Sequence, residues 1–222
     1  MLVGWQTTNE PYCRTWECRT CGSIVRDGAG SPREDEIVAN EDLLVELSMD
    51  ELREVAAFAT ACAEPVLAIF ERHCAGDTRA RSALDEALRF ASGGNRTKAL
   101  RMTAFAAHRA ARSAQEGGLE AAVDAARAAG HAGGAAYLHP LAKSTQVKHI
   151  LGAAAHAARA LELDAGDDYT VGDGYIEKAG SLASPTVVSV LTRYPRAPGG
   201  GGRVGELMRA LDTRLRGLQT CR

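Results

Sequence analysis

Three cysteines near the start of the chain have the spacing of a metal-binding run. Cys13, Cys18 and Cys21 form the pattern C-x4-C-x2-C, which matches part of a plant-type iron–sulfur run and could also begin a zinc site. A closed site needs a fourth ligand, and no Cys or His follows nearby. That ligand would have to come from a distant residue: Cys62, His73, Cys74 or Cys221. We therefore expect free, reduced thiols here and no bound metal.

Histidines in the middle of the chain could form a second site. His149 and His156 are seven residues apart, so they share a helix face, but not at the four-residue spacing that holds one ion best. Helical bundles that bind bridged metals also use Glu-x-x-His, which does not occur here. We expect core histidines bonded to backbone carbonyls. The alternative is a metal or acid–base site built from His108, His131, His149 and His156.

Other catalytic signatures are missing from the sequence. It contains no G-x-x-x-x-G-K-[ST] phosphate loop, no strand-flanked G-x-G-x-x-G and no G-x-S-x-G nucleophile elbow. The basic helices expected over residues 78–112 hold only Phe90 and Phe105 for base stacking. We therefore expect no catalytic residues, no cofactor and no nucleic-acid partner.

The composition favours helices that would position these residues. Of 222 residues, 41 are Ala and 23 are Gly, while aromatic residues make up 5%. Ala is the best helix former, and strand-favouring residues are sparse. No run approaches the roughly 20 apolar residues of a membrane span, and the N-terminus lacks the features of a secretory signal. We expect an all-α cytoplasmic protein without membrane contact.

Helix signals divide the chain into three parts. Residues 1–40 show neither helical nor strand periodicity and are expected to be loosely ordered. Residues 41–163 should form an antiparallel bundle of about five helices, beginning with a capping box at Ser48 and Glu51 and kinked near residues 61–65 by Pro65. Residues 164–222 should form a small helical extension. Expected helices after the first are 78–91, 96–116, 119–137, 145–162, 174–182, 185–194 and 203–217.

Charge is distributed unevenly although the net charge is only -2. Residues 34–71 contain eleven acids and one base, whereas residues 76–115 contain eight bases and three acids. One interpretation is that neighbouring helices pair opposite charges across solvated faces. The other is an acidic surface that steers a basic partner. The candidate partner contacts are Glu41, Asp42, Glu46, Asp50 and Glu54.

Several helical segments resemble a known bacterial family. Residues 54–71 and 77–87 resemble the first two helices of the Imm-five-like immunity proteins, and residues 106–112, 125–139 and 151–156 match further segments in the same order. The resemblance spans about residues 48–162. It implies a helical protein that neutralises a cognate protein toxin by stoichiometric binding, and it defines no catalytic residues. The alternatives are a metal-dependent helical enzyme and a helical small-molecule-binding or regulatory module.

Overall fold

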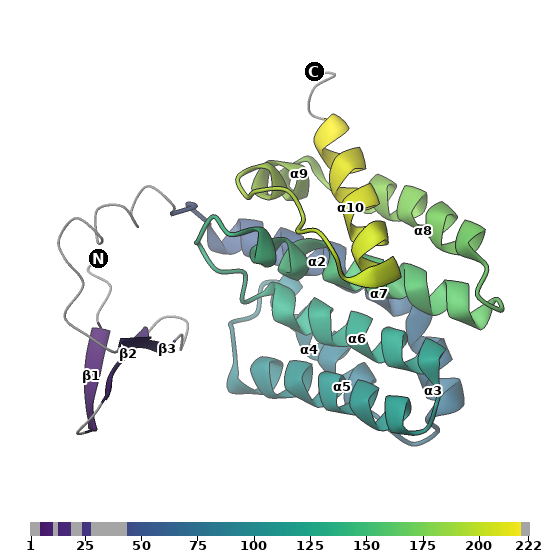
Figure 1. Cartoon of the computed structure of the whole chain (residues 1–222), viewed down its shortest axis with the longest axis horizontal. Coiled ribbons are helices and arrows are strands. Elements are labelled where there is room, and N and C mark those ends of the chain that lie inside the picture. The colour runs from purple at the N-terminus through teal and green to yellow at the C-terminus, as the bar shows by residue number, and fades with distance from the viewer. Residues whose placement is uncertain (1–4, 11–12, 19–23, 28–43, 219–222) are drawn as a thin grey trace. The chain divides into compact units, whose positions relative to one another are not determined.

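The computed structural model of the chain describes residues 5–10, 13–18, 24–27 and 44–218. These residues belong to two separate units, 1–44 and 45–222 (Figure 1). The helical unit contains the residues that carry the family resemblance.

The first unit contains a three-stranded antiparallel sheet. Its strands are β1 (Trp5–Glu10), β2 (Cys13–Cys18) and β3 (Ile24–Asp27), in the order β1-β2-β3. In the register, Trp16 pairs with Thr7 on one side and with Val25 on the other. The sequence showed no strand periodicity here, and the expectation that residues 1–40 are loosely ordered stays a prediction. Polar residues interrupt the alternation of apolar residues there, so the period-two signal is weak.

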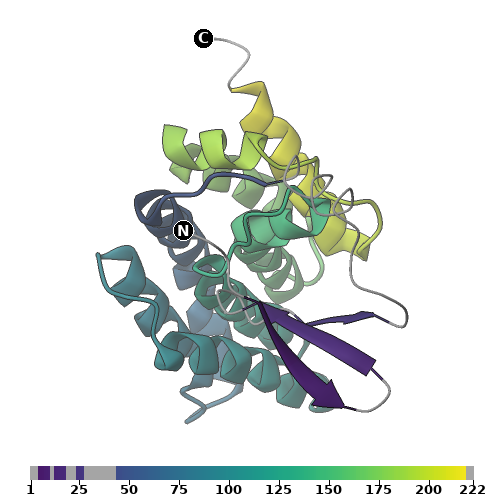
Figure 2. The same cartoon turned by 90° about the vertical axis from the view of Figure 1, so that its left-hand side faces the viewer.

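The second unit is all-α, as predicted. Its longer helices are α2 (Met49–Ala63), α4 (Arg79–Ala91), α5 (Lys98–Glu116), α6 (Glu120–Ala135), α7 (Val147–Asp164), α8 (Tyr169–Leu182) and α10 (Gly202–Gly217). Two shorter helices are α3 (Leu67–His73) and α9 (Pro185–Thr192), and 3-10 turns occupy η1 (Glu64–Val66) and η2 (Ser144–Gln146). Figures 1 and 2 show α5 at the lower edge of this unit and α8–α10 at its upper edge.

The start and the break of the first helix follow from local sequence. The Ser48 hydroxyl accepts from the Glu51 backbone N–H at 3.1 Å, and the Glu51 carboxylate accepts from the Ser48 N–H at 2.8 Å. This is the predicted capping box. Pro65 lies in η1, between α2 and α3, because proline cannot donate the hydrogen bond that would continue the helix. The predicted kink is confirmed.

Small residues allow the central helices to pack closely. Helix α6 buries eleven residues, most of them Ala or Gly, and packs against α2, α3, α4, α5 and α7. At Gly133 a Cβ atom would lie only 2.9 Å from the Cβ of Ala104 on α5. Close approach of the helix axes therefore depends on the missing side chain.

The C-terminal helices cover α7 and are tied together by polar contacts. Helix α8 begins at Tyr169 rather than at the predicted 174, because Asp168 caps it and accepts from the Thr170 N–H at 2.9 Å. Arg216 on α10 pairs with the buried Asp212 at 2.7 Å. The same guanidinium donates to the Leu191 carbonyl oxygen at 3.1 Å and so caps the end of α9.

Candidate functional site

Three imidazoles from three different helices lie in a row. The rings of His108 on α5 and His131 on α6 meet edge to face with centroids 5.3 Å apart. His131 stacks on His156 of α7 at 5.0 Å, with an angle of 16° between the ring planes. We call these three residues the histidine row. The structure therefore brings together three of the four predicted histidines.

Two glycines make room for the histidine row. A Cβ at Gly130 would lie 2.8 Å from the His108 ring, and a Cβ at Gly152 would lie 2.7 Å from Nδ1 of His131. Real Cβ atoms essentially never approach other atoms so closely. The row therefore depends on glycine in α6 and α7 as well as on the histidines themselves.

A carboxylate holds one end of the row. Nδ1 of His156 lies 2.6 Å from Oδ1 of Asp124, and both side chains are nearly buried. The fourth histidine, His149, lies apart from the row, with its Nδ1 2.9 Å from the Gly134 carbonyl oxygen. The prediction of a carbonyl-bonded core histidine is confirmed for His149. It is wrong for His156, whose partner is a side-chain carboxylate.

Burial favours the uncharged imidazole at His131, His108 and His149. Burial lowers the pKa of His131 well below 6.5, and the nearby His156 and His108 act in the same direction. Burial also lowers the pKa values of His108 and His149. Within the part of the chain that the structure describes, no group of three or more His, Cys, Asp or Glu residues is arranged to hold a metal ion.

The predicted cysteine cluster falls partly within the small sheet. Cys13 and Cys18 occupy opposite ends of β2, about 16 Å apart at the rise of an extended strand. Cys21 lies outside the described residues. A site that joined Cys13 to Cys18 would require β2 to be interrupted. In the helical unit Cys62 is buried, and burial raises the pKa of its thiol to about 12.

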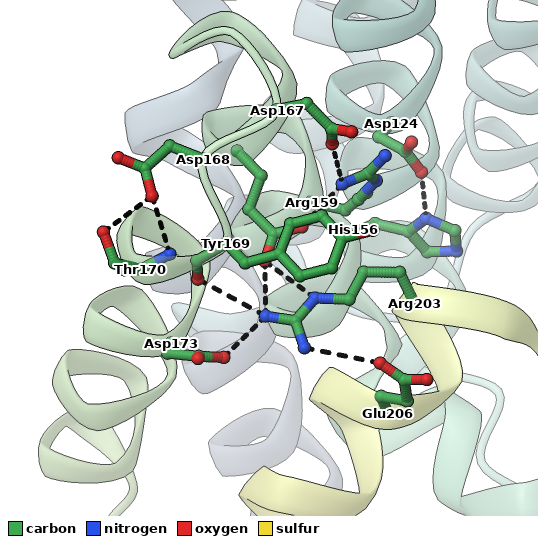
Figure 3. Close-up of polar contacts among 11 residues, drawn as sticks. Asp124, His156, Arg159, Asp167, Asp168, Tyr169, Thr170, Asp173, Arg203 and Glu206 are labelled. Atoms are coloured by element: carbon green, nitrogen blue, oxygen red, sulfur yellow. Dashed lines mark hydrogen bonds and ion pairs between the residues drawn. The ribbon is translucent and has the colours of Figure 1, made fainter.

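A buried carboxylate organises the most extensive ion-pair network of this region, which Figure 3 shows. Glu162 on α7 is fully buried. Its Oε1 accepts from Arg203 Nη2 at 2.7 Å and its Oε2 from Arg159 Nη1 at 2.8 Å. Arg203 also contacts Asp173 at 2.6 Å and stacks over the Tyr169 ring at 4.4 Å. These contacts join α7, α8 and α10.

The network leaves no room for a side chain at Gly172. A Cβ there would lie 2.0 Å from Oε1 of Glu162. Sequence reasoning missed Glu162 because a glutamate in an Ala-rich helix ordinarily faces solvent. The two arginines provide the compensating charge that a buried carboxylate requires. We interpret this network as structural because each of its central charges has a partner.

The predicted acidic surface is exposed where the structure describes it. Glu41 and Asp42 lie outside the described residues. Glu46, Asp50 and Glu54 are exposed around the first turns of α2, and the Asp50 side chain is 91% exposed. We call these three residues the α2 acidic face.

Nearby arginines and a serine contact this face. Asp50 accepts from Arg53 at 2.9 Å, and Glu54 accepts from the Ser184 hydroxyl at 2.8 Å. Arg193 donates to the Glu46 carbonyl oxygen at 2.7 Å and pairs with Glu51, which lowers the pKa of the Glu51 carboxyl. The face is therefore less acidic than the sequence count indicates, because part of its charge is neutralised within the fold.

Two depressions adjoin α2. The first, of about 520 Å³, is lined by Glu46, Leu47, Ser48, Glu51 and Arg193. The second, of about 430 Å³, lies between α2 and α4 and is called here the α2–α4 groove. Its lining residues are Ala57, Thr60, Ala61, Glu64, Arg81, Leu84, Asp85 and Leu88. Small side chains on α2 thus leave an apolar floor beside exposed carboxylates.

The helical unit is an all-α bundle, and comparison with known proteins identifies its family. The family model described as "Imm-5 like putative immunity protein" matches residues 46–179. The match covers more than half of the chain, and the protein belongs to this family. It includes α2 to α7 and most of α8, and it confirms the resemblance found in the sequence. No curated protein and no solved structure matches significantly.

Among the described residues, no helix combines the length and apolar character needed to cross a membrane. This finding concerns spanning helices alone, so the expected absence of any membrane contact stays a prediction.

Proposed function

We propose that this protein neutralises a cognate bacterial toxin in the cytoplasm by stoichiometric binding, without catalysis. Its membership of a family of immunity proteins carries this proposal. An immunity protein needs an exterior that a toxin can bind, and the exposed surface around α2 could provide one.

The α2 acidic face is the contact surface that we propose. Toxins that cleave nucleic acids are commonly basic because they must approach phosphates. Glu46, Asp50 and Glu54 are exposed, and the α2–α4 groove lies farther along the same helix. Coulomb attraction would speed the encounter, and apolar contacts in the groove would then slow dissociation. Glu41 and Asp42 complete the proposed contact set.

Charge reversal tests this surface. Any toxin that is found to be encoded beside the gene serves as the partner, and its association is followed by surface plasmon resonance at several salt concentrations. We expect the variant E46K/D50K/E54K to lower the association rate constant by about tenfold or more at low salt, because steering depends on these charges. It should also flatten the dependence of the rate on salt.

A matched variant controls for net charge. Glu116, Glu120 and Glu177 are exposed and lie on other helices, so E116K/E120K/E177K changes the total charge equally. We expect this variant to retain most of the association rate constant and its dependence on salt. Equal effects of the two variants, or no effect of the first, would reject the α2 acidic face as the contact surface.

A further inference from the structure

The outer side of α5 carries exposed apolar groups among positive charges. Met102 and Phe105 are 47% and 56% exposed. The steps from Lys98 to Met102, Phe105, Arg109 and Arg112 are four, three, four and three residues, so all five side chains lie along one side of the helix. We call these five residues the α5 face.

In the described part of the helical unit, the bases of the α5 face lack the carboxylate partners that other exposed arginines have. Arg72 pairs with Asp164, and Arg81 lies 2.9 Å from Glu71. Within residues 44–218, no carboxylate lies within ion-pair distance of Lys98, Arg109 or Arg112. The eight bases of residues 76–115 are therefore only partly neutralised inside the fold, and three of the remaining positive charges gather here.

The helical unit leaves this face uncovered. Helix α5 packs against α4 and α6, and its buried side consists of small residues and Leu100. Figures 1 and 2 place α5 at the lower edge of the unit, away from α8–α10. A large aromatic side chain at such an edge costs free energy in water unless something covers it. Exposed apolar groups rimmed by charge are typical of docking surfaces.

We propose that the α5 face docks an acidic amphipathic helix of a partner protein. Carboxylates of that helix would pair with Lys98, Arg109 and Arg112, and its apolar residues would cover Met102 and Phe105. This surface is independent of the α2 acidic face, which has the opposite charge and lies on another helix. The partner differs in chemistry from a basic toxin.

A protein fits this surface better than a nucleic acid does. Binding of single strands uses aromatic side chains on which successive bases stack. Of the two phenylalanines near these bases, Phe90 is only 1% exposed, so Phe105 stands alone. Met102 and Phe105 instead lie close enough together to contact apolar anchors that repeat every three or four residues on an amphipathic helix of the partner.

Nuclear magnetic resonance of the full 15N-labelled chain tests the proposal. The probe is a synthetic helical peptide with Leu and Glu at three- and four-residue spacing. We expect saturable amide shifts centred on α5. The variants R109E/R112E and F105A should each weaken binding by about tenfold. Absence of saturable shifts, or shifts centred outside α5, would overturn the proposal.

A matched variant and two further probes complete the design. K178E/R196E carries the same charge change at exposed residues outside α5 and should bind the peptide like the unmodified chain; equal weakening would count against the proposal. A single-stranded oligonucleotide should bind more weakly than the peptide, and tighter binding would contradict a protein partner. Sedimentation should show a monomer. Self-association that R109E/R112E abolishes would show that a second copy of the chain occupies the α5 face, and it would contradict the proposal. None of these results depends on toxin binding at α2.

Discussion

Acidification should destabilise this fold because His131 is held uncharged in the histidine row. Its pKa in the folded protein lies well below 6.5, whereas in the unfolded chain it takes up a proton near pH 6.5. Below that pH the unfolded state binds more protons than the native state, so the free energy of unfolding falls with decreasing pH. Above pH 6.5 both states are neutral at this position, and the contribution does not change.

The size of the effect follows from the same linkage. Between pH 7.5 and pH 5.5, one histidine that stays neutral in the native state lowers the free energy of unfolding by about 1.4 kcal/mol. His108 and His149 act in the same direction, since burial lowers their pKa values as well. Other groups that face the row are Asp124 and Arg127 from α6 and Lys148 from α7.

Urea unfolding at the two pH values measures this contribution. In H131Q the titrating group is missing from both states, so the loss of stability on acidification should be about 1.4 kcal/mol smaller than in the unmodified chain. H73Q is the control because His73 is exposed on α3, outside the row; it should retain the full loss. The reasoning is refuted if H131Q loses as much stability as the unmodified chain, whatever its stability at pH 7.5.

Three further predictions concern stability and are checked by urea unfolding at neutral pH. E162Q should lower the free energy of unfolding by about 3 kcal/mol because it removes the buried counter-charge of two arginines. E206Q, at an exposed partner 3.4 Å from Arg203, should change it by less than about 0.5 kcal/mol. Equal effects would contradict the stabilising role of the Glu162 network. G133A should cost about 1–3 kcal/mol because its Cβ would crowd α5, while G134A, with its nearest atom at 3.6 Å, should be neutral or stabilising. S48A should cost about 1 kcal/mol through the lost helix cap, and an unchanged midpoint would show that the cap contributes little.

Elements encoded by neighbouring residues could be predicted from the sequence. The capping box at Ser48 and the break at Pro65 depend on contacts within four residues, so local rules locate them. The start of α8 was predicted too late, at residue 174, although its Asp168 cap is also a local contact. Gly172 belongs to the helix, where it passes over the Glu162 carboxylate.

The site residues depend on contacts between distant parts of the chain. Periodicity indicated that His149 and His156 share a helix, but not that His131 would stack on His156 from another helix. Arg193 neutralises part of the acidic stretch from 142 residues away in sequence, through Glu51. No local signal reports such a pairing. The charge count therefore overstated the acidity of the surface around the start of α2.

Titration of toxin activity with this protein tests the central claim most directly. A toxin identified among the proteins encoded beside the gene is held at a fixed concentration far above the dissociation constant, and its residual activity is measured after each addition. Stoichiometric neutralisation predicts a linear fall that reaches zero at a fixed molar equivalence, with a complex of that composition in light scattering. Complete loss of toxin activity at a small fraction of an equivalent would indicate catalysis, and full toxin activity at excess would show that this toxin is not neutralised; either result would contradict the account.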